Sequence, residues 1–310
     1  MRSSNSQVMD PRAAAGRLAP YAKPTPLVRS LLLSSRLGCD LWVKNETVSP
    51  VASFKWRGAL NDVLREPSTS VVTSSTGNHG QGVAWAARVA DVTAHVFLPR
   101  GANPVKRAKI ELLGATIHDI GEDLDGAKAI AMRFARDEGL RFIDDGDSAG
   151  VIEGAGTVGL EIAQELERVD VVYVPMGSGS LASGVGMAMP DARIVAVQAK
   201  GSPAMVESFH ARRAIERPID TIADGLVCRV PAQLALDALI EHVDDALTVT
   251  DDELLAAVRA MILGAQLLVE PSGAAGLAAA MKGDVRGKTV VLIATGANIT
   301  AEALGNSSRA

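Results

Sequence analysis

The sequence has few of the residues that build disulfide-rich, nucleic-acid-binding or membrane proteins. Its two cysteines, Cys39 and Cys228, lie far apart and lack the spacing of metal ligands. This cysteine usage indicates a reduced, cytoplasmic protein. The net charge of −5 provides no basic field for nucleic acid and no polybasic patch for a membrane surface. No apolar run approaches the roughly 18 residues of a spanning helix, so we expect neither nucleic acid nor membrane as a partner.

Aromatic residues are also scarce, at 3% of the chain, while Ala, Val, Leu and Gly dominate. That composition suits helices packed closely on a parallel sheet better than an aromatic-rich β-sandwich. Hydrophobic residues make up 47% and charged residues 22%, an ordinary balance for a globular protein. The stretch Met1–Pro20 has no signal-peptide core, and we expect it to be a partly ordered leader.

Short β-branched runs alternate with amphipathic or alanine-rich stretches along the whole chain. This alternation predicts βαβ units and parallel sheets, with ligands at the junctions where strands end and helices begin. The expected strands are Asp40–Lys44, Val71–Thr73, Val92–Leu98, Val171–Pro175, Arg193–Gln198 and Thr289–Ala294. The expected helices are Phe54–Arg65, Asn78–Ala90, Pro104–Leu113, Leu124–Glu138, Thr157–Leu166 and Asp251–Leu268. The glycine-rich segment Ala149–Gly159 is expected to be a domain crossover.

A glycine–serine loop, Gly177–Gly184 (GSGSLASG), follows the expected buried strand Val171–Pro175 and precedes a small-residue helix. Small side chains there let backbone N–H groups and a helix N-terminus surround a phosphate, although a tight strand–helix turn gives the same pattern. A dinucleotide site would also need an acidic residue after the next strand, which instead ends in Gln198 and Ala199. No Walker lysine follows the glycines either. The loop therefore favours a cofactor with one small phosphate.

Lys55 stands in the segment Ser53–Ala59 (SFKWRGA), between Phe54 and Trp56 at an expected helix start. An isolated lysine is most often a solvated surface residue. These aromatic neighbours instead favour partial burial and the neutral amine that Schiff-base chemistry requires.

A serine turn, Ser74–Gly82 (SSTGNHGQG), follows the expected strand Val71–Thr73. Its hydroxyls and amides suit either a plain helix cap or a carboxylate-binding site. His79 is not needed for capping, whereas His95, His118, His210 and His242 have no such neighbours and are interpreted as ordinary residues.

Together these three segments resemble the fold-type II pyridoxal-phosphate (PLP) enzymes, and specifically the serine/threonine dehydratase (ammonia-lyase) and serine racemase family. The resemblance continues, in family order, through residues 103–115 (NPVKRAKIELLGA), 153–162 (EGAGTVGLEI), 221–226 (TIADGL), 270–280 (EPSGAAGLAAA) and 295–298 (TGAN). It implies an α/β fold of the tryptophan synthase β type, with two open, twisted, mostly parallel sheets and flanking helices. A large PLP-binding domain would comprise residues 1–68 and 148–310, and a small domain residues 69–147. The chain ends soon after residue 298, and we expect no C-terminal regulatory domain.

The resemblance also assigns roles to residues. Lys55 would carry pyridoxal 5'-phosphate as a Schiff base, with Phe54 against the ring and Asn78 near the phenolic oxygen. The remaining cofactor-binding residues would be Gly177, Ser178, Gly179, Ser180 and Leu181 at the phosphate and Thr295 at the pyridine nitrogen. The substrate carboxylate would bind to Ser75, Thr76, Asn78 and His79.

The predicted activity is α,β-elimination of a β-hydroxy amino acid, such as L-threonine or L-serine, to a 2-oxo acid and ammonia. Thr295 can only donate a hydrogen bond where many PLP enzymes place an aspartate, which favours elimination over transamination. Lys55 is the expected catalytic base, and Thr76 stands where serine racemases use a serine as second acid/base. Racemisation, cysteine-synthase-like β-replacement and dehydration of a bulkier or acidic substrate remain the alternatives. Gln198 and Ala204 replace the expected ligands of a divalent cation, so no metal is predicted. A homodimer is expected from the family.

Overall fold

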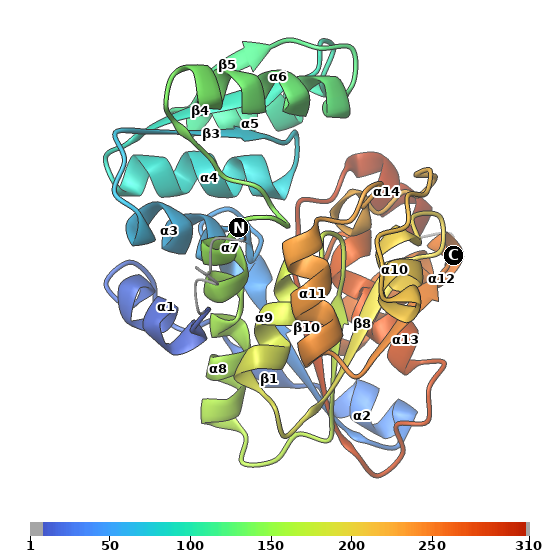
Figure 1. Ribbon diagram of the computed structural model, residues 1–310. Coiled ribbons are helices and arrows are strands. Elements are labelled where there is room, and N and C mark those ends of the chain that lie inside the picture. Colours follow the sequence, from blue (N-terminus) through green and yellow to red (C-terminus); the bar gives the residue numbers. More distant parts are fainter. Residues whose placement is uncertain (1–8, 308–310) are drawn as a thin grey trace.

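The computed structural model describes residues 9–307, which form two open sheets flanked by helices (Figure 1). The larger sheet has the strand order β1-β2-β10-β7-β8-β9, in which only the edge pair β1 and β2 is antiparallel. The smaller sheet has the order β5-β4-β3-β6 and is parallel throughout. The predicted α/β architecture of two mostly parallel sheets is confirmed.

Strands of the larger sheet are β1 (Leu27–Arg29), β2 (Asp40–Asn45), β7 (Val171–Pro175), β8 (Arg193–Ala199), β9 (Asp245–Val249) and β10 (Thr289–Ala294). Those of the smaller sheet are β3 (Ser70–Ser74), β4 (Thr93–Leu98), β5 (Thr116–Asp119) and β6 (Arg141–Phe142). All six predicted strands are present, with ends that differ by no more than a residue. The four that the sequence did not predict are β1, β5, β6 and β9.

The helices follow the strands as βαβ units require. They are α1 (Pro11–Leu18), α2 (Leu31–Leu37), α3 (Lys55–Arg65), α4 (Asn78–Val89), α5 (Pro104–Leu112), α6 (Leu124–Asp137), α7 (Ala149–Ala155), α8 (Thr157–Glu165), α9 (Ser180–Ala188), α10 (Ala204–Ala211), α11 (Gln233–His242), α12 (Asp251–Ala265), α13 (Ala275–Ala280) and α14 (Ala301–Ser307). Three short 3₁₀ turns, η1 (Glu46–Val48), η2 (Asp224–Leu226) and η3 (Pro271–Ala274), complete the set. None of the helices in this described part is long and apolar enough to span a bilayer.

The centre of the larger sheet is buried on both faces. Alternate residues of β10 point to opposite sides, so Val290 and Leu292 join one core while Val291 and Ile293 join the other. Helices therefore cover both faces, and the strands read as near-continuous apolar runs. This burial explains why β7 and β10 could be predicted from their valine content alone.

The described part of the expected leader is an ordered helix packed on the body of the protein. Ala14 and Leu18 of α1 are buried, and Arg17 forms an ion pair with the buried Glu153 of α7 at 2.6 Å. The backbone N–H of Asp10 also donates to Glu153 at 3.0 Å. Residues 10–18 of the expected partly ordered leader are thus ordered, and its first eight residues lie outside the described part of the chain.

The glycine-rich segment between the two sheets forms two helices, α7 and α8. A Cβ on Gly154 would lie 2.5 Å from the carbonyl oxygen of Arg57, and one on Gly150 would lie 2.8 Å from Cα of Asp62. Glycine is needed here because α7 and α3 approach backbone to backbone. The chain crosses at this point from the smaller to the larger sheet, while the division into domains at residues 69 and 147 stays a prediction.

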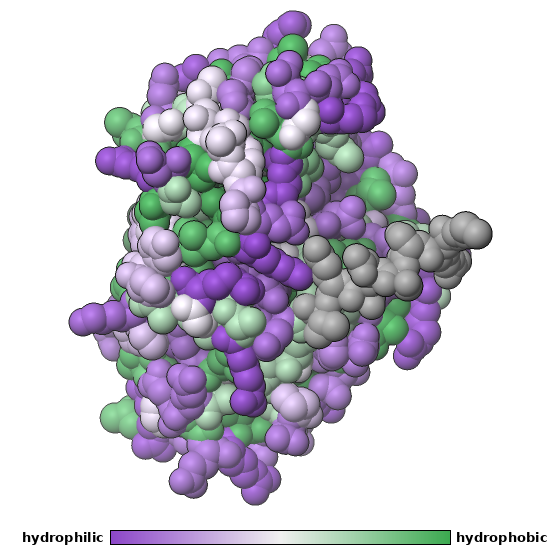
Figure 2. Space-filling view, turned by 60° about the vertical axis from the view of Figure 1, so that its left-hand side comes forward, coloured by the Kyte–Doolittle hydropathy of each residue, from purple (hydrophilic) through white to green (hydrophobic). Residues whose placement is uncertain are grey.

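The surface seen in Figure 2 is largely hydrophilic, with hydrophobic residues in small groups. This view turns the side that carries α1, α3 and α4 toward the reader. Scattered apolar residues of this kind are normal on a protein surface.

Candidate active site

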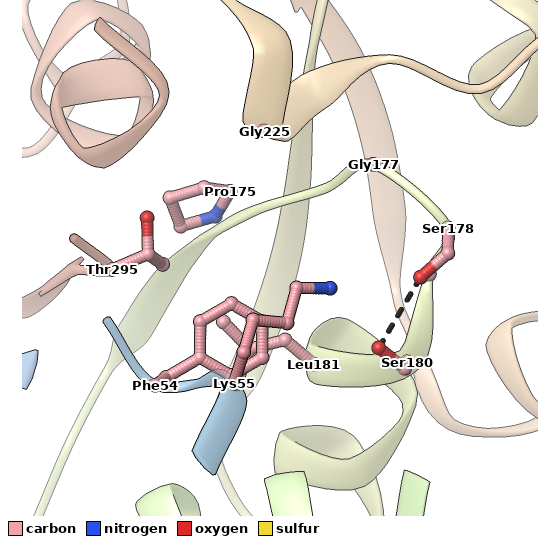
Figure 3. A pocket seen from close by; sticks show the side chains of 10 residues that line it. Phe54, Lys55, Pro175, Gly177, Ser178, Ser180, Leu181, Gly225 and Thr295 are labelled. Atoms are coloured by element: carbon pink, nitrogen blue, oxygen red, sulfur yellow. Dashed lines mark hydrogen bonds between the residues drawn. The ribbon is translucent and has the colours of Figure 1, made fainter. Parts of the chain in front are cut away.

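A cavity opens at the carboxyl ends of β7 and β10, where α3 and α9 begin (Figure 3). This is the position where open parallel sheets hold their ligands. The described residues that line it are Phe54, Lys55, Pro175, Gly177, Ser178, Gly179, Ser180, Leu181, Gly225 and Thr295. The structure thus brings Lys55, the glycine–serine loop and Thr295 together around one space.

The glycine–serine loop is shaped to bind an anion. Gly179 has a left-handed backbone (φ 94°), and a Cβ on it would lie 2.6 Å from Cε of Met205. The loop leads into the N-terminus of α9, where the first N–H groups have no partner within the helix. The Ser178 and Ser180 hydroxyls lie 3.2 Å apart beside them. That this loop holds a phosphate group stays a prediction, which its geometry supports.

Lys55 is the first residue of α3, and its position is fixed on three sides. The N–H of Phe54, the N-cap residue, donates to the carbonyl of Thr295 at 3.0 Å. A Cβ on Gly82 of α4 would lie 3.2 Å from Cβ of Lys55, so only glycine lets the two helices approach this closely. The side chain is 11% exposed, and its amine lies 4.8 Å from the centroid of the Phe54 ring. Lys55 is therefore not a solvated surface lysine.

A buried ion network holds the first turn of α3 in place. Arg57, 1% exposed, donates to Glu46 at 2.8 Å and to Glu161 of α8 at 2.6 Å. Lys44, fully buried, lies 2.7 Å from the same Glu161. Because buried charges are tolerated only with partners in good geometry, this network fixes the start of α3 relative to β2 and α8.

Asp145 meets Lys55 inside the site. Both of its carboxylate oxygens lie 2.5 Å from Lys55 Nζ, and Oδ1 lies 3.5 Å from Nδ1 of the buried His79. Burial alone would raise the pKa of Asp145, but the charge of the Lys55 ammonium and its hydrogen bond lower that pKa to about 2. Burial also lowers the pKa of His79, so its ring is neutral at pH 7. The serine turn is thereby linked to Lys55 through Asp145.

Asn78 joins the serine turn to the larger sheet. Its amide donates to Glu270 at 2.7 Å, and it accepts from Asn298 at 2.7 Å. Burial raises the pKa of Glu270 to about 7, with the Asn78 amide acting in the opposite direction. Ser75 and Thr76 are half-buried at the start of the same turn, and the Ser75 hydroxyl accepts from the N–H of Gly77 at 3.2 Å.

Thr295 lies across the cavity from the serine hydroxyls. Figure 3 shows the Lys55 side chain between Thr295 on one side and Ser178 and Ser180 on the other, with its amine pointing toward the serines. Thr295 is 5% exposed and directly follows β10. An elongated ligand in this cavity would therefore touch a hydroxyl at one end and the anion-binding loop at the other.

Comparison with known proteins decides which cofactor this arrangement serves. Residues 18–296 match the family model described as pyridoxal-phosphate dependent enzyme. The chain belongs to this family. Its two open sheets and the lysine beside a phosphate-sized loop are those of a fold-type II PLP enzyme, so the predicted cofactor is confirmed.

Relatives of this PLP-dependent enzyme include both lyases and racemases. It is 36% identical over 287 residues to the L-threonine ammonia-lyase of Thermotoga maritima. This match covers 89% of this chain and 71% of that protein. It is 30% identical over 305 residues to the catabolic L-threonine dehydratase of Staphylococcus aureus, covering 94% and 88% respectively. The solved structure of maize serine racemase superposes with a TM-score of 0.90 at 31% identity, covering 96% of this chain and 95% of that one.

Three polar residues of the PLP enzyme's site had no role in the sequence prediction: Asp145, Glu270 and Asn298. The acidic run Asp144–Asp147 after a short strand was the one sequence signal for Asp145. Glu270 and Asn298 stand inside motifs that carried the family resemblance, but nothing in the sequence paired them with Asn78.

Gln198, which stands where cation-binding relatives are expected to have a carboxylate, is fully engaged within the fold. Its carbonyl oxygen accepts from the N–H groups of Met205 and Val206, each at 3.1 Å, and its amide donates to Leu226 at 3.4 Å. Across residues 9–307 no cluster of three or more metal-ligating side chains occurs. His95 and His118, interpreted as ordinary, in fact lie 3.1 Å apart on β4 and β5.

Proposed function

We propose that this protein eliminates water from a β-hydroxy amino acid such as L-serine or L-threonine and releases a 2-oxo acid and ammonia. The observation that carries the proposal is the Lys55 amine. It is largely buried and projects between Thr295 and the glycine–serine loop in a PLP-dependent enzyme. The similarity to L-threonine ammonia-lyases supports the same reaction class.

The glycine–serine loop would hold the cofactor phosphate. Gly177 and Gly179 have no side chain to cover the backbone of the loop, and a Cβ on Gly177 would also collide with the carbonyl oxygen of Gly225 at 2.6 Å. Ser178 and Ser180 would add hydroxyl donors, and Leu181 would add a backbone N–H from the first turn of α9.

The cofactor ring would lie between the loop and Thr295. Lys55 would bind its carbonyl carbon, Phe54 would pack against the ring, and Asn78 would approach the phenolic oxygen. Asn78 is suited to this role because Glu270 and Asn298 fix its amide from both sides. Thr295 would donate its hydroxyl to the ring nitrogen, which fits elimination better than transamination.

The serine turn would bind the substrate carboxylate through Ser75, Thr76, Asn78 and His79. The chemistry that bound PLP supplies is an electron sink for the charge that develops at the substrate Cα. The Lys55 amine would remove the α-proton of the substrate as general base. This amine is held within the cavity by α3, so proton removal needs no large movement of the chain.

The charge around the cavity favours a substrate with an uncharged side chain. Among the described residues that line it, Lys55 alone carries a charged side chain, and its amine already faces Asp145. A second substrate carboxylate, as in 3-hydroxyaspartate, would meet the negative charge of Asp145 if it entered this cavity. We therefore place serine and threonine ahead of acidic 3-hydroxy amino acids.

Racemisation is the second candidate, because the serine racemase of maize has so similar a structure. A racemase needs a proton donor on the face of Cα opposite to the lysine, and Thr76 would have to take that role here. β-Replacement has weaker support, since His79 stands where cysteine synthases usually have a threonine.

A substrate screen distinguishes these activities. Purified enzyme is incubated with L-serine, L-threonine and 3-hydroxyaspartate, and 2-oxo acid, ammonia and the chirality of recovered substrate are measured. Elimination predicts equal amounts of 2-oxo acid and ammonia from serine or threonine, with the recovered substrate still of the L form. Inversion of the substrate without ammonia would show a racemase instead.

A further inference from the structure

The roles assigned above include no protein side chain that protonates the departing β-hydroxyl. Hydroxide is a poor leaving group, so the departing oxygen must be protonated as its bond to Cβ breaks. Meanwhile the proton taken from Cα rests on the Lys55 amine. A group that carries it from Lys55 to the β-oxygen would complete the cycle and restore Lys55 as a base.

Asp145 is in contact with Lys55 at the distance such a transfer needs. Both carboxylate oxygens lie 2.5 Å from Nζ, within hydrogen-bond reach. The hydroxyl is attached to the carbon next to Cα, so a group in contact with the Cα base can reach it when the hydroxyl faces the same side of the substrate. The Asp145 carbonyl accepts from the hydroxyl of Ser178 at 3.2 Å, which ties this turn to the glycine–serine loop.

His79 provides a second place for the same proton. Its Nε2 lies 3.2 Å from the carbonyl oxygen of Ile143, which can only accept, so Nε2 carries the hydrogen. Nδ1 then presents a lone pair, is buried without a hydrogen-bond partner, and lies 3.5 Å from Oδ1 of Asp145. Two acceptors that face each other in this way can be joined by one added proton.

The surrounding charges couple Asp145 to the state of Lys55. The groups that face it are Lys55 of α3, His79 of α4, Cys228, and Asp144, which pairs with Lys128 of α6 at 2.5 Å. While Lys55 is an ammonium, its charge keeps the pKa of Asp145 low, at about 2. When Lys55 becomes neutral, burial acts in the opposite direction and favours the protonated carboxyl.

We propose that Asp145, backed by His79, accepts the α-proton from Lys55 and donates it to the departing β-hydroxyl. The C–H bond at Cα breaks toward the Lys55 nitrogen, the proton passes to Asp145, and the Cβ–O bond breaks as that proton forms water. Asp145 ends as the carboxylate and Lys55 as the neutral amine. This inference rests on the proposed function.

Comparison of two leaving groups in Asp145→Asn tests the inference. Asparagine has the same size but cannot carry the proton, and chloride, unlike hydroxide, departs without one. We expect 2-oxo acid release from L-serine to fall on the order of 100-fold or more, with release from β-chloro-L-alanine nearly unchanged. Asp147→Asn, an exposed residue of the same turn, is the matched control and should preserve both rates.

The possible outcomes separate the two proposals. If Asp145→Asn slowed the reactions of L-serine and β-chloro-L-alanine equally, Asp145 would be a structural residue and the proposed proton transfer through it would be wrong. Unchanged rates with both substrates would also overturn that proton transfer. Wild-type enzyme that releases 2-oxo acid from neither compound would overturn the proposed function as well. Nitrogen NMR of protein labelled at histidine, with the His79 signals assigned by comparison with His79→Gln, gives a readout that does not need turnover. An unprotonated Nδ1 on His79 supports the proposed proton transfer, and a protonated Nδ1 contradicts it.

Discussion

Replacement of Arg57 by leucine tests whether the buried ion network holds α3, and with it Lys55, in place. Arg57 is 1% exposed, and its guanidinium is the partner of the fully buried Glu46 and of Glu161. Glu161 would still have Lys44 at 2.7 Å, whereas Glu46 would lose its charged partner and keep the hydrogen bond from the Thr25 hydroxyl. Removing one member of a buried pair costs about 3–5 kcal/mol. For a chain of this size that corresponds to a fall in Tm on the order of 10 °C.

The assay is thermal unfolding of the cofactor-loaded protein. The affinity for PLP is measured as well, because Lys55 and Arg57 lie in the same first turn of α3, so a displaced Arg57 segment should also displace Lys55. Arg193→Leu is the control: its exposed pair with Asp245 should contribute about 0–1 kcal/mol. In a double-mutant cycle, Arg57→Leu with Glu46→Leu should recover part of the loss, since no buried charge is then left alone. An Arg57→Leu protein that melts within about 2 °C of wild type would refute this reasoning.

Two further predictions concern the glycine–serine loop and the buried Glu270. Gly179→Ala should lower the free energy of unfolding by roughly 1–2 kcal/mol because of its left-handed backbone alone, and it should weaken PLP binding in a titration. Gly16→Ala on α1 is the control: a Cβ there meets nothing within 4 Å, so neither stability nor PLP binding should fall. Unaltered PLP affinity in Gly179→Ala would contradict the anion-binding role of the loop. The pKa of Glu270 in the folded protein, about 7, lies above that of an unfolded glutamate. The folded protein therefore holds the proton of this carboxyl more tightly than the unfolded chain does. Its stability should fall as pH rises from about 4.5 to 7. Denaturant unfolding of wild type and Glu270→Gln across that range checks this, and identical pH slopes in the two proteins would disprove it.

Buried, apolar elements were the ones that could be predicted from the sequence. β7 and β10 lie at the centre of the larger sheet and consist of near-continuous Val, Leu and Ile, so their pattern is unambiguous. β5 and β6 are short and only partly buried, and local sequence carries little signal for such edge strands. α1 was not among the predicted helices, because its small apolar face is completed by α7, which lies far along the chain.

Site residues could be predicted where they share a local motif and not where they meet across the fold. Lys55, the serine turn and the glycine–serine loop are contiguous segments with recognisable composition. Asp145 meets Lys55 across 90 positions, and Glu270 meets Asn78 across 192. Such pairs depend on how the two sheets are arranged, which no local pattern contains.

The central claim is that Lys55 is both the cofactor lysine and the base of an elimination reaction. Its most direct test is Lys55→Ala against Lys23→Ala, an exposed lysine elsewhere on the chain, in one assay with L-serine and L-threonine. Lys55→Ala should lose the visible absorption of lysine-bound PLP and all release of 2-oxo acid, while Lys23→Ala should keep both. Undiminished absorption and 2-oxo acid release from Lys55→Ala would contradict the central claim.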